Sequence, residues 1–266
     1  MRKYLTVFAI DWQNQFIYRL NFIFWRVRNV FRLLLTYFLW LGVFTSTESV
    51  FGYSQSQMFS YVFLVMIVHA IVLSAPSSDN IGGEIGSGDL SNYLVKPVSY
   101  IKYWFARDLS SKLLNLLFSI GEIFLLYYLL QPVLVIFPES FQVIPFLITL
   151  VLVVPLYYFI NLSTRFISFW TPENTWGLAF LIIIFYETLG GIIFPLDVLP
   201  VWAKTAVQFT PFPYLVYYPV VILLGKVSGF EFYRILAQTF IWTVVMFIIA
   251  RFIWQKGLKV YSSEGR

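Results

Sequence analysis

The chain has 266 residues, of which 59% are hydrophobic and only 12% are charged, and its formal net charge is +5. A soluble globular domain carries about 25% charged residues, so this composition excludes an ordinary soluble protein and predicts a chain whose main solvent is lipid. The chain has no cysteine and a single histidine, which excludes disulfides, thiolate metal sites and cysteine nucleophiles and leaves no metal site to expect.

The first 25 residues predict an amphipathic helix that lies in the membrane interface. In KYLTVFAIDWQNQFIYRLNFIFW, Phe8, Trp12, Phe16 and Leu20 recur every fourth residue, and polar side chains recur on another side. Aromatic anchors opposite a polar face are typical of interfacial helices. The pattern also fits a helix packed on the protein itself, but the small soluble mass of the chain favours the interface.

Six apolar stretches predict six transmembrane helices, because a hydrocarbon core of roughly 30 Å needs about 20 helical residues. The stretches are Val30–Phe44, Met58–Ser74, Leu109–Leu130, Phe141–Ile160, Trp176–Phe194 and Ile235–Trp254. The predicted fold class is therefore an all-α, multi-pass membrane protein, with residues 1–266 forming a single transmembrane domain.

The distribution of basic residues predicts that both termini lie in the cytoplasm. Fifteen of the 18 lysines and arginines fall before or at the start of the first span, in the second and fourth loops, or at the end of the chain. Only Lys204, Lys226 and Arg234 fall on the other side. Cytoplasmic loops are the ones that carry the excess of Lys and Arg.

The stretch 76–105, between the second and third spans, predicts a structured cytoplasmic loop. Its centre, GEIGSGDLSNYLVKPVSY (83–100), is too polar to cross a bilayer. Asp79 or Ser78 is placed to cap a short helix near Ile81, and the glycines that follow break the chain.

A second short helix is predicted after Asp89, a suitable N-cap residue. Three residues at i, i+3 and i+4 would form its apolar face, namely Leu90, Tyr93 and Leu94. Lys96 favours the helix C-terminus and Pro97 ends the helix. Because an isolated helix this short is marginal, we expect the face to dock into a groove of a partner, onto the chain's own cytoplasmic helix ends, or both.

Three ionisable residues fall inside predicted spans: His69, Glu122 and Glu187. Each costs about 3 kcal/mol in a bilayer unless it is paired, so each is a candidate functional residue. The glutamates could relay protons, lie near the outer head groups or hydrogen-bond neighbouring helices. For the lone histidine on an aromatic-rich helix, a structural role is favoured.

The stretch 190–230 predicts a re-entrant pair of short helices that enters the outer leaflet and returns. Its apolar part, Tyr214–Leu224, is only about half a span. Proline breaks helices, and broken backbone survives at membrane depth only where protein buries it or it lines a cavity. The prolines are Pro195, Pro200, Pro211, Pro213 and Pro219. A plain external loop with an interfacial helix remains the alternative.

Signatures of enzymes are missing from the sequence. It contains no HExxH, no GxSxG elbow and no GxxxxGK[ST] phosphate loop, so the chain is not expected to hydrolyse ATP by that route. The glycines at 82, 83, 86 and 88 follow a membrane span rather than a strand. The inner-face bias of the basic residues explains the net charge, so we expect no nucleic-acid partner.

Three stretches together resemble the membrane subunits of type-2 ATP-binding-cassette (ABC) exporters, and most of all the compact six-helix bacterial permeases. They are FIYRLNFIFW before the first span, EIGSGDLSNYLVKPVSY between the second and third spans, and WAKTAVQFTPFPYLVYYPVVILLGK before the last span. Their order and their places in the topology, over nearly the whole chain, make the set more specific than any one of them.

The resemblance implies a permease subunit in the bacterial cytoplasmic (inner) membrane that pairs with a similar subunit as a homodimer or heterodimer. Each half would bind a cytoplasmic ABC ATPase, which holds ATP and Mg, so the chain itself would carry no cofactor and no catalytic site. The residues at positions that match the family's coupling helix lie between Glu84 and Pro97: Glu84, Gly88, Asp89, Leu90, Tyr93, Leu94, Lys96 and Pro97. The segment at the outer gate would be shaped by Gly190, Gly191, Pro195, Pro200 and Pro211.

The function predicted is export of a substrate from the cytoplasm, powered by a separate ATPase. One alternative is a proton-coupled secondary transporter that uses Glu122 or Glu187; such folds usually show internal repeats, and none is found here. Another is an intramembrane enzyme or assembly factor, for which one histidine and no cysteine leave few catalytic combinations.

Overall fold

The computed structural model describes residues 2–17, 19–74, 79–134, 140–227 and 229–262, and these parts of the chain are mostly helical. The longer helices are α1 (Arg2–Ile17), α2 (Arg19–Val43), α3 (Gln55–Val72), α6 (Tyr100–Leu130), α7 (Ser140–Phe166), α8 (Thr175–Leu189) and α11 (Phe230–Val260). The short elements are the hairpin β1 (Ser49–Val50) and β2 (Tyr53–Ser54), the helices α4 (Asp79–Gly86), α5 (Ser91–Leu94), α9 (Val201–Gln208) and α10 (Tyr217–Leu223), and the 3-10 turns η2 (Ile167–Phe169), η3 (Pro172–Asn174), η4 (Leu196–Val198) and η5 (Phe212–Tyr214).

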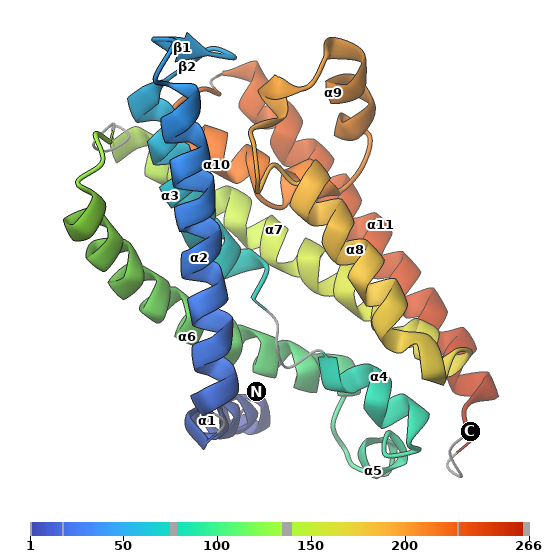
Figure 1. Cartoon of the computed structure of the whole chain (residues 1–266). Coiled ribbons are helices and arrows are strands. Elements are labelled where there is room, and N and C mark those ends of the chain that lie inside the picture. The colour runs from blue at the N-terminus through green and yellow to red at the C-terminus, as the bar shows by residue number, and fades with distance from the viewer. Residues whose placement is uncertain (1, 18, 75–78, 135–139, 228, 263–266) are drawn as a thin grey trace.

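The molecule has two distinct ends (Figure 1). One end carries α1, α4, α5 and both chain ends, and we call it the termini end. The other carries the β1–β2 hairpin and α9, and we call it the hairpin end. The long helices run between the two ends, so the loops of 76–105 and of 190–230 lie far apart.

The six predicted spans correspond to α2, α3, α6, α7, α8 and α11. Within the described residues, four stretches are long and apolar enough to cross a membrane: α3, α6, α11 and Gln142–Phe169. A fifth is counted if Val201–Gln208 and Phe212–Leu223, which are bent by 82° relative to each other, form a single span. The apolar stretch of α8 is short, and α2 carries Arg26, Arg28 and Arg32. A predominantly helical, multi-pass membrane fold is thus confirmed, whereas the count of six crossings and the side on which the termini lie stay predictions.

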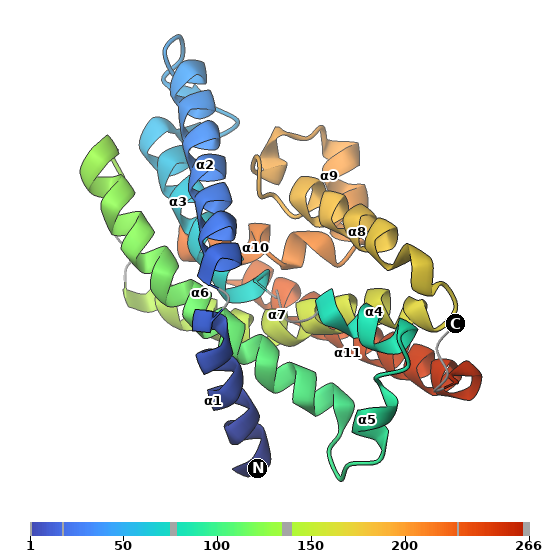
Figure 2. The same cartoon turned by 60° about the horizontal axis from the view of Figure 1, so that its bottom comes forward.

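The described residues of the N-terminal 25 lie in α1 and in the start of α2, and residue 18 between them lies outside the described residues. The interfacial position predicted for this stretch stays a prediction. α1 lies alongside the first part of α6, as Figure 2 shows, and α2 rises away from it toward the hairpin end. Asp11 of α1 and Arg26 of α2 each form an ion pair with α6, and the chain turns between these two anchors.

The larger hydrophobic core lies around α3 and α10. α3 buries 12 of its 18 residues, and all seven residues of α10 are buried. A helix that is apolar on every side is one that is surrounded by protein or lipid, which explains why α3 shows no amphipathic pattern. The second half of the bent pair, α10, is therefore buried in protein, whereas α9 buries only Val207.

A smaller core holds the termini end together. Ile81, Ile85 and Leu90, all from the stretch 76–105, pack there with buried aromatic residues such as Trp104 and Phe166. The long helices α7 and α11 lie side by side, and a Cβ atom at Gly257 of α11 would overlap the Phe169 ring of η2. Glycine at this position is what allows the last helix to approach so closely.

Candidate functional site

The stretch 83–97 is attached to the body of the protein through the carboxylate of Glu84. This carboxylate accepts hydrogen bonds from the hydroxyl groups of Tyr93, at 3.0 Å, and Tyr100, at 2.6 Å. Burial raises the pKa of Glu84 above its ordinary value, although both tyrosine hydroxyls act in the opposite direction. Glu84 therefore joins α4, α5 and the start of α6, and its side chain does not point away as a contact for a partner.

A second attachment comes from the far end of the chain. Gly88 has a φ of +84°, which favours glycine, and its carbonyl accepts a hydrogen bond from the hydroxyl of Tyr261. The same hydroxyl accepts a bond from the backbone N–H of Ser91 at 3.0 Å. Tyr261 follows the last helix directly, so the turn between α4 and α5 is fixed to the C-terminal part of the protein.

Two details predicted for this stretch are wrong. Asp89 does not cap α5: the capping residue is Leu90, without a side-chain bond, and the Asp89 carboxylate accepts the Ser87 hydroxyl at 2.6 Å instead. The predicted common apolar face is also divided, since Leu90 is fully buried whereas Leu94 is 46% exposed. A helix of four residues is too short to present one face, and the smaller core takes up Leu90.

The exposed part of the stretch is the turn Leu94–Pro97. Val95 is 83% exposed, and Lys96 and Pro97 are exposed beside it. The α1 helix supports this turn, because Lys3 donates to the Pro97 carbonyl and the Ser99 N–H donates to the Tyr4 hydroxyl at 3.2 Å. An apolar tip on a turn held from several sides is a surface suited to contact with another protein.

Both glutamates that were predicted to lie within spans are paired with arginines of α2. The carboxylate of Glu122 accepts from Nε of Arg26 at 2.6 Å, and Asn115 and Ser119 bind the same guanidinium. Glu187 lies 3.4 Å from Arg32. Because each pair joins α2 to another helix, the geometry favours a role in helix packing over a proton relay.

Sequence reasoning missed a further buried pair in α6. Nζ of Lys112 lies 3.0 Å from Asp108 and donates to the Ser74 carbonyl at 2.9 Å, which closes the end of α3. The i, i+4 spacing of an acid and a base was the available signal. Across the described ranges, no three His, Asp or Glu side chains lie close enough together to hold a metal ion.

A polar cavity of about 750 Å³ lies among α1, α2, α3, α6, α7 and α8. His69, which is 8% exposed, contributes to its wall, as does Glu187. Its other charged lining residues are Asp11, Arg28, Arg107 and Arg165. A second cavity of about 430 Å³, between α1, α2 and α6, is lined mainly by apolar side chains. We call these the polar cavity and the apolar cavity.

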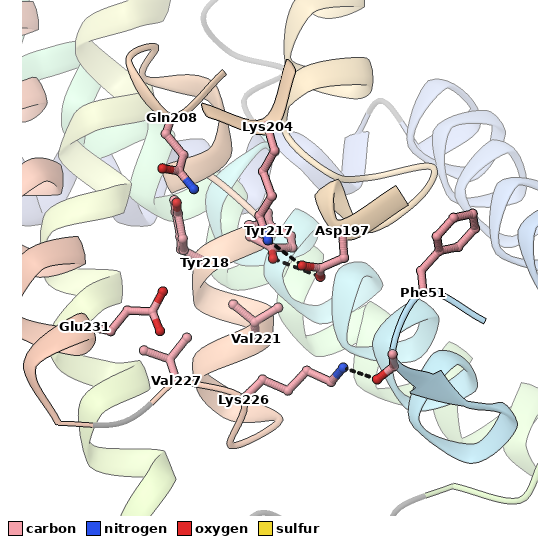
Figure 3. Close-up of a pocket in the computed structure, with 11 residues that line it drawn as sticks. Phe51, Asp197, Lys204, Gln208, Tyr217, Tyr218, Val221, Lys226, Val227 and Glu231 are labelled. Carbon is pink, nitrogen blue, oxygen red and sulfur yellow. Dashed lines mark hydrogen bonds and ion pairs between the residues drawn. The ribbon is translucent and has the colours of Figure 1, made fainter. Parts of the chain in front are cut away.

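At the hairpin end, the carboxylate of Asp197 is the acceptor for three side chains (Figure 3). The hydroxyl of Tyr217 donates at 2.9 Å and Nζ of Lys204 at 2.6 Å, and both bonds are drawn in Figure 3. The Tyr53 hydroxyl, which the figure does not draw, donates at 2.7 Å. Burial opposes ionisation of Asp197, but the bonds from Lys204 and the tyrosines outweigh it and hold its pKa below the ordinary value. Lys226 lies over the Tyr53 ring at 3.1 Å and donates to the Gly52 carbonyl at 2.8 Å.

The cluster joins separate parts of the chain around a cavity of about 360 Å³. Tyr53 comes from β2, Asp197 from η4, Lys204 from α9 and Tyr217 from α10. Sequence reasoning named the prolines of this region but missed Asp197, whose partner Tyr53 lies 144 residues away. No pattern in the sequence pointed to that pairing.

The predicted glycines and prolines of 190–230 lie at turns between these elements. Gly191 has a φ of +76°, and its carbonyl accepts the Tyr61 hydroxyl, while the Gly190 carbonyl accepts the Tyr217 N–H at 2.9 Å. Pro195, Pro200 and Pro211 are the capping residues of η4, α9 and η5, whereas Pro213 lies within η5 and Pro219 within α10. Proline suits the start of a helix, where its missing N–H leaves no bond unmade.

Comparison with known proteins agrees with the helical membrane fold. A family model described as "ABC-2 family transporter protein" matches residues 30–265, which is nearly the whole chain. Among curated proteins, none matches this chain. The family consists of membrane subunits, generally without an ATPase site of their own, and implies association with an ABC ATPase. The chain belongs to the ABC-2 family of transporter proteins.

Proposed function

We propose that the chain is the permease subunit of an ABC exporter and that a separate ATPase docks on the turn Leu94–Pro97. The observation that carries this proposal is the exposed apolar tip of that turn, Val95, on a base that Glu84, Tyr261 and α1 hold in place. A contact that transmits force must be exposed at its tip and rigid at its base. Glu84, Gly88 and Leu90 then belong to the base, and Leu94 to Pro97 belong to the contact.

The same proposal places the termini end in the cytoplasm of a bacterial cell, with six spans across the cytoplasmic membrane. The bias of 15 of 18 basic residues toward one side supports this orientation. The helices α2 and α8 complete the six crossings, because the ion pair of Arg32 with Glu187 neutralises charges that would otherwise be costly in lipid.

In the proposed cycle, ATP and Mg bind to the ATPase and not to this chain. Closure of two ATPases moves the turn Leu94–Pro97, and the attachments to α1, α6 and Tyr261 pass the motion to the spans. Two permease chains, identical or similar, enclose the pathway. The bent segment of 190–230, buried around α10, acts as the outer gate, shaped by Gly190, Gly191 and the prolines.

A pair of matched variants tests the docking surface. Val95→Asp places a charge on the proposed contact, and Val201→Asp makes the same change at the hairpin end, where Val201 is 82% exposed against 83% for Val95. Each tagged protein is extracted in mild detergent, and a co-purifying ATPase is identified by mass spectrometry and its ATP hydrolysis is measured. We expect Val95→Asp to lose at least about 2 kcal/mol of binding, which is a roughly 30-fold weaker association, because it leaves a charge in a buried contact.

The control should recover the ATPase as well as the unchanged protein does. Equal recovery with Val95→Asp would show that the ATPase does not dock on this turn. If no ATPase is recovered even with the unchanged protein after cross-linking, the exporter proposal itself fails.

A further inference from the structure

We propose that the polar cavity and the apolar cavity form one binding site for an anionic amphiphile, with its acidic head group in the first and its hydrocarbon chain in the second. The binding itself is argued from this chain alone. That the bound molecule represents the class of exported substrate rests on the proposed function.

The charges of the polar cavity favour an anion. Three arginines and two carboxylates line it, and both carboxylates are already paired, Asp11 with Arg107 and Glu187 with Arg32. Arg28 forms no ion pair within the part of the chain that the structure describes, and its guanidinium lies over the Trp25 ring at 4.1 Å. Stacking on Trp25 orients the planar guanidinium, which can then bind a phosphate or carboxylate through two parallel hydrogen bonds.

Neutral polar groups in the same cavity suit the rest of a head group. Six amide side chains line the wall, among them Asn14, Asn80 and Asn161. The side-chain N–H₂ of Asn161 is buried and has no hydrogen-bond partner within the described residues, so a ligand oxygen could accept from it. A head group with hydroxyl or phosphate oxygens would satisfy these donors.

The apolar cavity suits a hydrocarbon chain. Nine of its twelve lining residues are aliphatic or aromatic, including Val27, Val30 and Phe118. Its two charged residues, Arg26 and Glu122, form an ion pair with each other and so offer no net charge to a ligand. A chain of methylene groups is the ligand that such a surface favours, because burying apolar surface away from water stabilises the complex.

The two cavities adjoin at the junction of α1 and α2. The side chains of Gln15 and Phe22 line both of them, so the two cavities share part of their wall. A water-soluble anion would use only the polar cavity, and a neutral lipid only the apolar one. A molecule with an acidic head joined to a hydrocarbon chain is the class that uses both.

Binding is measured by native mass spectrometry on the full chain in detergent, with three probes. Phosphatidylglycerol carries head and chains, diacylglycerol carries chains only, and glycerol phosphate carries the charge only. We expect phosphatidylglycerol to bind at least about tenfold more tightly than either of the others, a difference of about 1.4 kcal/mol. Binding of diacylglycerol or glycerol phosphate as tight as that of phosphatidylglycerol would overturn the shared site.

Single substitutions test which residues of the two cavities contact the head group and which contact the hydrocarbon chains. Arg28→Gln should weaken the binding of phosphatidylglycerol about tenfold, because one charge-assisted contact is lost. The binding of diacylglycerol should not change. Val30→Phe should weaken the binding of both phosphatidylglycerol and diacylglycerol, because the larger side chain fills the apolar cavity. Arg251→Gln removes an exposed arginine of α11 and is the matched control. If Arg28→Gln binds phosphatidylglycerol like Arg251→Gln, the head group does not lie in the polar cavity and the proposal fails.

A final measurement separates an exported molecule from a resident membrane lipid. Phosphatidylglycerol is added to the reconstituted complex with its ATPase, and ATP hydrolysis is followed. Stimulation that Arg28→Gln abolishes identifies the acidic amphiphile as the exported class. Binding without stimulation identifies a resident lipid and removes only the substrate assignment. Failure to recover any ATPase would remove the proposed function, but not the binding result.

Discussion

The two ends of the molecule each hold a carboxylate that accepts two tyrosine hydroxyls, yet the pKa values of the two carboxylates move in opposite directions. At the termini end, Glu84 binds Tyr93 and Tyr100, and its pKa is raised. At the hairpin end, Asp197 binds Tyr53 and Tyr217, and its pKa is lowered. The hairpin cluster adds a hydrogen bond from the ammonium group of Lys204, and this bond and those of the tyrosines together outweigh the burial of the carboxylate. The positive charge of Arg107 also acts to lower the pKa of Glu84, but burial outweighs it, so a cation in direct contact is what distinguishes the hairpin cluster.

Glycine replacement in a turn with a positive φ should show the largest effect on stability. At Gly191, an alanine Cβ would lie 2.8 Å from both Cβ of Tyr217 and the Tyr61 hydroxyl oxygen, on a backbone with φ of +76°. We expect Gly191→Ala to lose about 3 kcal/mol of stability, from backbone strain and overpacking together. The measurement is the thermal unfolding midpoint in detergent.

Gly88→Ala is the counterpart at the termini end, where φ is +84°. We expect it to lose about 1–2 kcal/mol from backbone strain. Gly177→Ala, at a helix position with open space around the Cβ, should not destabilise and serves as control. Equal losses at Gly191 and Gly88 would mean that the close contacts with Tyr217 and Tyr61 add nothing to the backbone strain at Gly191.

The opposite pKa shifts predict opposite dependences of stability on pH. A carboxylate with a lowered pKa contributes stability above its ordinary value, which is 3.8 for Asp197, and loses that contribution as the pH falls through the folded-state pKa. A raised pKa, as for Glu84, gives a contribution that is present below 4.5 and is lost as the pH rises through the folded-state pKa.

Two isosteric variants, followed by unfolding between pH 3 and pH 7, test these signs. Relative to Asp197→Asn, the unchanged protein should lose stability below pH 3.8, whereas relative to Glu84→Gln it should lose stability as the pH rises above 4.5. Lys204→Met removes the cation. The contribution of Asp197 to stability should then fall less at low pH, so that its pH dependence becomes more like that of Glu84. The same sign for both carboxylates would refute the role given to Lys204.

The smallest effect is expected for the attachment of the chain's last part. Tyr261→Phe removes the hydroxyl that binds the Gly88 carbonyl and the Ser91 N–H, and should cost about 1 kcal/mol. It should also raise the rate of hydrogen exchange at the backbone amides of residues 83–97, without changing the rate at the amides of residues 190–230. Tyr233→Phe, an exposed tyrosine at the start of α11, is the control. Unchanged exchange at 83–97 would show that Tyr261 does not restrain the turn.

The sequence predicted those features that depend on local composition. Runs of apolar residues predicted the helices α2, α3, α6, α7, α8 and α11, and Pro195, Pro200 and Pro211 predicted the breaks of 190–230, because an apolar run and a proline each act on the backbone within a few residues. Pairings over long distances were not predictable. In the sequence, 96 residues separate Arg26 from Glu122, and 144 residues separate Tyr53 from Asp197. The capping role expected for Asp89 was wrong, because its carboxylate accepts the Ser87 hydroxyl and the N-cap of the helix falls one residue later, at Leu90.

The Arg26–Glu122 pair has a consequence for how the protein is made. Because 96 residues separate the two side chains, a ribosome that adds about 5–20 residues per second makes Arg26 roughly 5–20 s before its partner exists. A lone arginine is costly at membrane depth, so we expect α2 to remain near the interface until α6 is synthesised. The first span would then complete its insertion after later ones, and this chain would enter the bilayer out of the order in which it is translated.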